Sequence, residues 1–298
     1  MERVPISVTS EWGQLKSAIS HNASNMINCP DQADLFTAEE LAKHPEQGPI
    51  VRNQFQSQHS RFRQLLAQSG VQLVAPETQP GAFCQVYTRD FGFVVDRTFF
   101  ISTAIRDDYR KPEVEGLKSI VQNVDGEVCE LNQGITEGGD IMVINDNLVF
   151  VGIGNTTDQE GYQNLANHLR EKGIAKIESV PHFALHLDCC LAPLPNGKVL
   201  HSQSRLPKSS REMLKPYFSE FIPLDPKEDV IDLAANIVWL NPEEVVSTQN
   251  ARKTNQLLRE MGYKVHVVKY GQPIRFWGST RCTVGPLYRG KLPNLTEV

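Results

Sequence analysis

Cys282 differs from the other cysteines of the chain in its sequence neighbours. It ends the segment GSTRC, in which Gly278 would let the backbone approach a ligand closely and Arg281 places a cation beside the sulfur. A nearby positive charge increases the fraction of a thiol that is ionised, and the thiolate is the nucleophilic form. Cys282 is therefore a candidate nucleophile, although an isolated cysteine is more often a small buried apolar residue.

An imidazole and several carboxylates occur in two further short motifs. In HLD, His186 and Asp188 would point to the same face of a strand, because side chains alternate along a strand. In EGGD, two glycines separate Glu137 from Asp140, which indicates a tight backbone requirement. Glu137 could accept a hydrogen bond from a histidine ring and favour the imidazolium form. Each motif alone is weak, since structural histidines and surface acids are common.

Asp90 ends the motif TRD and precedes a strongly apolar run. It could cap the following strand or pair with Arg89. Alternatively, Asp90 and Asp188 could each accept two N–H bonds from one planar guanidinium, an arrangement that is strong and selective in geometry. The motifs together would then combine a nucleophile, an acid–base group and a clamp for a cationic substrate.

The elements that must position these motifs form a repeating pattern. A strand–turn–strand–helix–strand unit recurs about four times at intervals of roughly 50 residues, which suggests radial or stacked repetition. In our reading each motif lies at a strand end, and HLD lies on a strand. Helices are predicted over about 39–70, 112–121, 157–173, 209–218 and 250–262, between short apolar strands. A closed ring of such units would bring loops from every unit to one central channel.

Composition excludes several functional classes. The 298 residues carry a net charge of −5 with 40% hydrophobic residues, and they contain no basic run typical of nucleic-acid binding. No apolar stretch reaches the roughly 20 residues that a membrane span needs. The N-terminus has no apolar signal core, and the six cysteines form no C-x-x-C pair. These features predict a cytosolic protein with free thiols.

Taken in order, the motifs resemble the guanidine-modifying enzyme superfamily, which includes arginine deiminases, arginine dihydrolases, dimethylarginine hydrolases and amidinotransferases. The order of carboxylate, EGGD, H-x-D and C-terminal cysteine extends from Asp90 to Cys282, and EWGQLKSAISHNAS (residues 11–24) is similar to the family's first strand. The resemblance implies an α/β fold, a five-bladed propeller of ββαβ units (the pentein fold), as a single catalytic domain over residues 1–298. It also implies no metal or organic cofactor and a small guanidino substrate, without a nucleic-acid or membrane partner. A homo-oligomer is compatible with it.

The same resemblance implies roles for the motif residues. Cys282 would attack the guanidinium carbon and form a covalent S-alkylthiouronium intermediate. His186 would serve as general acid and base, oriented by Glu137. Asp90 and Asp188 would hold the guanidinium nitrogens, and Asp140 would be a further substrate contact.

The choice among family members depends on a few positions. Asp188 favours an unmethylated guanidinium. The neutral amides of Gln85 and Asn22 could bind a ureido intermediate, as an arginine dihydrolase forming ornithine, ammonia and CO2 requires. We therefore expect an arginine dihydrolase, with an arginine deiminase forming citrulline as the alternative. A dimethylarginine hydrolase, an amidinotransferase and a non-catalytic, RNA-binding propeller are further alternatives.

The residue that would bind the substrate's α-carboxylate is left open by the sequence. Thr156 occupies the position where many members of the superfamily have an arginine. Arg106 and Arg110 are the next candidates, and Arg281 is a third. Each of these arginines could equally be an ordinary solvated side chain.

Overall fold

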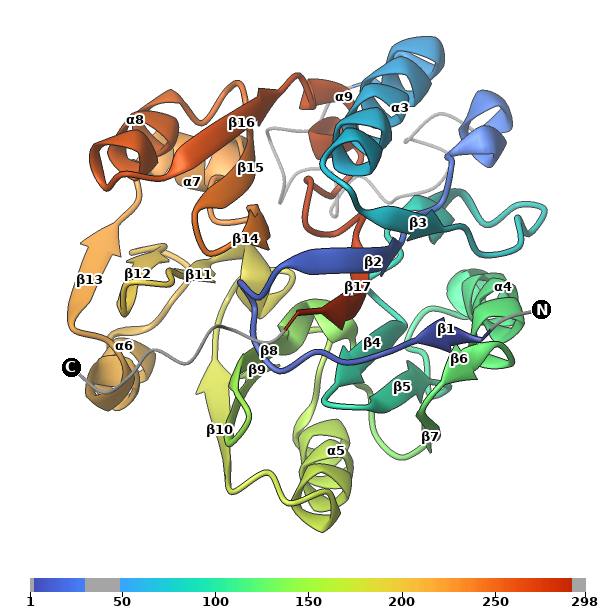
Figure 1. Cartoon of the computed structure of the whole chain (residues 1–298), viewed down its shortest axis with the longest axis horizontal. Helices are drawn as coiled ribbons and strands as arrows, with labels where there is room; N and C mark the ends of the chain where they lie inside the picture. The colour runs from blue at the N-terminus through green and yellow to red at the C-terminus, as the bar shows by residue number, and fades with distance from the viewer. Residues whose placement is uncertain (1–2, 30–48, 291–298) are drawn as a thin grey trace.

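The computed structural model describes residues 3–29 and 49–290, which form five three-stranded sheets arranged as a ring (Figure 1). Each sheet combines an antiparallel pair of strands with a third strand that is parallel to its neighbour, and a helix connects the second strand to the third. The observed architecture is therefore a five-bladed α/β propeller of ββαβ units, as the resemblance implied. Helices α3, α4, α5, α6 and α8 lie at the periphery of the ring in Figure 1.

The blade that follows Asp90 illustrates how the sequence forms one unit. Strands β4 (Gly92–Val95) and β5 (Thr98–Ser102) are buried and mostly apolar, and they pair with Val95 opposite Thr98. Asp96 turns the chain between them in the left-handed region at φ 50°. Helix α4 (Lys111–Val121), with proline in its first turn, then leads to β7 (Glu127–Leu131), which pairs in parallel with β5.

Three further blades repeat this order along the chain. Their strands are β8 (Ile141–Asn145), β9 (Leu148–Ile153) and β10 (Lys176–Pro181); β11 (Leu191–Pro193), β12 (Lys198–His201) and β13 (Glu220–Pro223); and β14 (Val238–Asn241), β15 (Glu244–Thr248) and β16 (Lys264–Val268). Their covering helices are α5 (Gln159–Glu171), α6 (Lys208–Leu214) and α8 (Arg252–Glu260).

The fifth blade joins the two ends of the described chain. Strand β2 (Leu15–Ile19) pairs antiparallel with β17 (Gly285–Arg289) and parallel with β3 (Gln72–Val74), and α3 (Arg52–Gln68) connects β2 to β3. A small parallel pair, β1 (Val4–Pro5) with β6 (Val124–Asp125), lies outside the blades. The segment that carries Cys282 is thus held in place by a strand from the beginning of the chain.

Most predicted elements are confirmed, with some differences in their bounds. The predicted helix over 39–70 is observed from Arg52, and residues 39–48 fall outside the described part of the chain. The helices α7 (Pro226–Ile231) and α9 (Gly271–Arg275), the strand β17 and the small pair β1 and β6 were not predicted. HLD is not on a strand, because residues 187–189 form the 3-10 turn η5. None of the helices in the described ranges is long and apolar enough to span a membrane.

Candidate active site

The predicted catalytic side chains come from equivalent places in different blades. Each lies in the turn that precedes a blade's first strand: Asp90 before β4, Glu137 before β8, His186 before β11 and Cys282 before β17. In the remaining blade, Asn236 lies two residues before the start of β14. Because the blades form a ring, these five turns converge.

Four of the residues predicted to react with or hold the guanidinium group line one cavity of about 120 Å³. They are Asp90, Glu137, His186 and Cys282. The other lining residues are Cys84, Tyr87, Arg106, Asp107, Tyr109, Arg110, Thr156, Leu185 and Trp277. Cys282 is 4% exposed, so its sulfur is enclosed, but it is enclosed at the cavity and not in an apolar core.

The imidazole of His186 is paired with the carboxylate of Glu137. His186 Nε2 lies 2.8 Å from Glu137 Oε2, and both side chains are buried. Burial opposes protonation, but the hydrogen bond to Glu137 and the charges of Asp90 and Asp140 outweigh it and raise the pKa of His186 well above its usual value. The imidazolium form is therefore the resting state at neutral pH.

The EGGD motif is explained by close packing. A Cβ atom at Gly139 would lie 2.5 Å from Cγ of His186, and one at Gly138 would lie 2.2 Å from the carbonyl oxygen of Arg89. Glycine is thus needed at position 139 for the turn to pass close to the imidazole, and at position 138 for it to pass close to the backbone of Arg89.

Asp90 already holds a guanidinium group that belongs to the chain itself. Arg110 donates from Nη2 to Asp90 Oδ2 at 2.7 Å and also pairs with Glu113, while its Nη1 lies 3.9 Å from Glu137 Oε2. Burial raises the pKa of Glu113 to about 7 despite the opposing effect of Arg110. Arg110 is therefore bound mainly through its carboxylate partners, and its ring contact with Phe91, 4.5 Å to the centroid, adds a cation–π interaction.

Asn236, which the sequence analysis did not identify, anchors the cysteine. Its Oδ1 accepts from the backbone N–H of Arg281 at 3.0 Å and of Cys282 at 3.3 Å, and it lies 3.3 Å from Cys282 Sγ. Its backbone oxygen accepts from Thr280. The available signal was positional, since Asn236 precedes its blade's first strand as the other site residues precede theirs.

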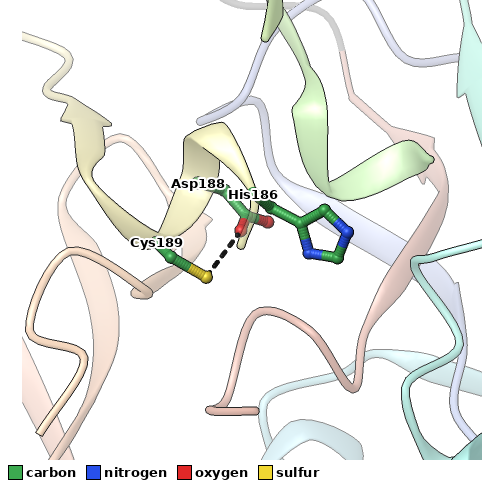
Figure 2. Close-up of side chains that lie close together, drawn as sticks. All are labelled: His186, Asp188 and Cys189. Atoms are coloured by element: carbon green, nitrogen blue, oxygen red, sulfur yellow. Dashed lines mark hydrogen bonds between the residues drawn. The ribbon is translucent and has the colours of Figure 1, made fainter. Parts of the chain in front are cut away.

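Asp188 requires a correction, because its carboxylate does not line the cavity. Oδ2 lies 3.1 Å from Nε of Arg281 and 3.2 Å from Nε of Arg89, and Oδ1 accepts from Asn236. Figure 2 shows Asp188 between His186 and Cys189, whose thiol donates to it at 3.5 Å. Since the HLD segment is a turn and not a strand, His186 and Asp188 do not share a face.

Three other predicted substrate contacts also lie outside the cavity. Asp140 is fully buried and accepts from Thr157, Thr156, His182 and Leu187 N, so it joins segments of the chain. Burial opposes ionisation, but these bonds lower its pKa below the usual value. Gln85 bonds the backbone of residues 77 and 79, and Asn22 is exposed and accepts from the N–H of residue 24.

The arginine candidates for carboxylate binding divide between the cavity and the core. Arg106 and Arg110 both line the cavity, and Arg106 is 43% exposed in its side chain and pairs with Asp107. Arg281 is buried against Glu11 and Asp188, which removes it as a candidate. Thr156 lines the cavity, where its hydroxyl donates to Asp140 and to a backbone oxygen.

Among the residues that the structure describes, two sets of side chains have ligand atoms within 4.8 Å of one another, as a metal site would need. They are Asp90, Glu137 and His186, and His186, Asp188 and Cys189. In each set an arginine is already paired with an aspartate, Arg110 with Asp90 and Arg281 with Asp188. The guanidinium charge would repel a bound cation. The absence of a cofactor stays a prediction.

Comparison of the sequence with known proteins shows the family to which the chain belongs. The sequence pattern of arginine deiminase matches residues 83–216 and 223–289. The chain belongs to the arginine deiminase family. The matched ranges include Asp90, Glu137, His186, Asn236 and Cys282, and the family's members act on guanidino groups.

Two relatives match most of the chain. The uncharacterized protein YkgA of Bacillus subtilis is 29% identical over 253 residues, which cover 85% of this chain and 86% of YkgA. The dimethylarginine dimethylaminohydrolase of Streptomyces coelicolor is 27% identical over 252 residues, covering 82% of this chain and 90% of the relative. The chain is thus similar in sequence over nearly the whole length of both.

Solved structures share the fold at low sequence identity. The amidinotransferase SxtG of Microseira wollei has a TM-score of 0.79 at 16% identity, covering 97% of this chain and 99% of SxtG. The N-terminal domain of ArgZ, a cyanobacterial arginine dihydrolase, has a TM-score of 0.78 at 16% identity, covering 94% and 100%. These likenesses confirm the pentein fold and do not distinguish hydrolase from transferase.

Proposed function

We propose that the chain hydrolyses the guanidino group of L-arginine, or of a close relative, through a covalent adduct on Cys282. The supporting observation is the convergence of four blades on one cavity, which receives a thiol, a protonated imidazole and two carboxylates. The shared fold is compatible with this chemistry but does not select it.

Binding would use the carboxylate oxygens that the chain leaves open. Asp90 Oδ1 has no hydrogen bond within the described residues, because Arg110 uses Oδ2, and His186 uses Oε2 of Glu137. We infer that Asp90 and Glu137, in place of the predicted pair Asp90 and Asp188, hold the guanidinium plane. The carbon then presents its face to Cys282, and fixed orientation lowers the entropic part of the barrier.

The first chemical step would form the covalent intermediate. The Cys282 thiolate attacks the guanidinium carbon and gives a tetrahedral adduct. The His186 imidazolium then donates its proton to one nitrogen, the C–N bond breaks, and ammonia leaves. An S-alkylthiouronium group remains on Cys282, and His186 is neutral.

The second step would return the enzyme to its starting state. Neutral His186 takes a proton from water, and the water oxygen attacks the thiouronium carbon. The C–S bond then breaks and regenerates the thiolate, and the ureido product departs after its hydroxyl proton is lost to solvent. Transfer to an amine acceptor, as in an amidinotransferase, would differ only in the group that attacks the thiouronium.

One hydrolysis is favoured over the two that a dihydrolase needs. Gln85 and Asn22 were predicted to bind the neutral ureido intermediate, but neither lines the cavity, and no other asparagine or glutamine among the described residues does so. We therefore place the arginine dihydrolase second. Since Asp188 does not reach the cavity, it gives no reason to exclude a methylated guanidinium.

Product analysis tests the proposal. The chain is incubated separately with L-arginine, with N-methylated arginine and with L-arginine plus an amine acceptor, and the products are separated by chromatography. Citrulline with one ammonia per arginine is expected, whereas ornithine with two would support the dihydrolase. Mass spectrometry of protein quenched during turnover should find the adduct on the peptide that contains Cys282. Turnover by Cys282→Ser at most of the native rate would refute the mechanism.

A further inference from the structure

A second cleft lies between helices α3 and α9 and is separate from the active-site cavity. It has a volume of about 250 Å³ and shares no lining residue with the first cavity. Its walls come from α3, α9, the end of α7 and the turn after β15. Nothing in the proposed reaction uses it.

Two buried glutamines present unused hydrogen-bond donors to this cleft. Gln58 and Gln272 are 7% and 8% exposed, and both line the cleft. Their oxygens are occupied, since Gln58 accepts from Gln272 N at 2.9 Å and Gln272 accepts from Val51 N at 2.6 Å. Their amide nitrogens donate to no residue in the described ranges. Both amide nitrogens are therefore available to a ligand in the cleft.

The charges around the cleft define the chemistry that it would accept. Lys269 and Arg275 line it, and Lys269 forms no ion pair with the described residues. The Lys269 cation and two amide donors suit a carboxylate. Asp232 also lines the cleft, beside Asn250, and could accept an ammonium group. Together these side chains match a small zwitterion that carries a carboxylate and an ammonium group.

Helix α9 connects the cleft to the active site. It carries Gln272 and leads directly into the segment of Trp277 and Cys282. The hydroxyl of Tyr87, a residue of the active-site wall, donates to the backbone oxygens of Pro273 and Phe276. Trp277 lines the same cavity with φ 77°, a conformation that a bulky side chain holds only under external constraint.

We propose that the cleft between α3 and α9 binds a small α-amino acid, with its carboxylate at Lys269 and the glutamine amides and its ammonium at Asp232. Occupancy would tie α9 to α3 and thereby shift the position of Tyr87 and Trp277, which changes the affinity for the guanidino substrate. The binding site stands independently of the proposed function, whereas the coupling to the active site rests on it.

Binding is measured by calorimetry on the whole chain with three matched probes. They are L-norvaline, which has both groups, pentanoate, which lacks the ammonium, and L-norvalinamide, which lacks the carboxylate. Native protein should bind L-norvaline more tightly than either analogue. Lys269→Met should weaken L-norvaline binding about tenfold or more, and Asp232→Asn should weaken L-norvaline but not pentanoate.

Lys264→Met is the matched control, because Lys264 is an exposed lysine on β16 whose pairing with Glu244 lies outside the cleft. It should leave binding unchanged. The site is refuted if native protein binds none of the probes, or if Lys269→Met binds L-norvaline as native protein does.

Coupling is measured as the KM for the guanidino substrate with and without saturating L-norvaline. A change of about fivefold is expected in native protein, and none in Lys269→Met. Competition at the active site would persist in Lys269→Met, and that result refutes the coupling while leaving the binding result intact. If no substrate is turned over, the calorimetry still decides whether the site exists.

Discussion

The charge of His186 is the property on which both proposed steps depend. The ring must be protonated to release the leaving nitrogen and neutral to activate water. Burial alone would keep it neutral, but Glu137 at 2.8 Å and the nearby Asp90 raise its pKa well above the usual value. The acid form is therefore present through neutral pH and is lost as pH rises through that raised pKa.

Replacement of Glu137 by glutamine should move this transition. Glu137→Gln keeps the shape of the side chain but removes the negative charge that favours imidazolium, so the pKa of His186 falls. We expect the alkaline limb of the kcat–pH profile to shift down by about one pH unit or more. We also expect kcat to drop about 100-fold. A lower kcat with an unmoved alkaline limb would mean that Glu137 only supports the fold around the ring.

Residue types in short motifs predicted four side chains that meet in one cavity, but not the direction of every carboxylate. Asp90 and Asp188 both end motifs that precede an apolar strand, and the sequence treats them alike. They differ because Asp188 is held by Arg89 and Arg281, which belong to two other motifs. No local pattern shows that these arginines reach the same carboxylate, since the three segments meet only in the closed ring.

At the scale of elements, the turns that precede the first strands determine where side chains point. In the turn η4 (Gly138–Asp140) the backbone passes against the face of His186. Gly139→Ala would place a Cβ 2.5 Å from Cγ of the imidazole, so the ring must move away from Glu137. A displacement of about 1 Å can reduce the rate about 100-fold.

The expected result for Gly139→Ala is thus a large fall in kcat with folding retained. The matched control is Gly290→Ala, where the nearest atom to the added Cβ is 3.7 Å away and activity should stay at the native level. Kinetics and thermal unfolding of both variants distinguish a displaced imidazole from a loss of folding. Native kcat in Gly139→Ala would show that the imidazole does not need the observed position.

The periodic pattern of apolar residues was sufficient to predict the strands and helices that recur from blade to blade, because every blade has the same burial pattern. It failed for short or irregular elements. Helices α7 and α9 have six and five residues, too few to show a helical period, and β17 begins with glycine and proline. The HLD segment leads into the turn η5 (Leu187–Cys189), but its apolar centre also suits a strand, so only the three-dimensional contacts distinguish the two.

On the scale of the whole molecule, the ring is closed by residues that are far apart in sequence. Strand β2 pairs with β17, so the strands of the fifth blade come from both ends of the described chain. For this reason the sequence pattern revealed four repeating units but not the fifth. A buried ion network links blades in the same way. Glu11 and Asp188 meet Arg89 and Arg281, with Arg281 Nη2 at 2.7 Å from Glu11 and Arg89 Nη2 at 3.7 Å from it.

Asp188→Asn tests whether this network, and not substrate binding, is the role of Asp188. The change leaves Arg89 and Arg281 buried with one carboxylate fewer, and removal of one member of a buried ion pair costs about 3–5 kcal/mol of unfolding free energy. We expect a clear fall in the midpoint of thermal unfolding, with KM changed less than in Asp90→Asn. Asp146→Asn makes the same chemical change on an exposed turn and should shift stability by no more than about 0.5 kcal/mol. If instead Asp188→Asn unfolds as native protein does but binds substrate poorly, the carboxylate must turn towards the cavity when substrate is present, as the sequence motif predicts.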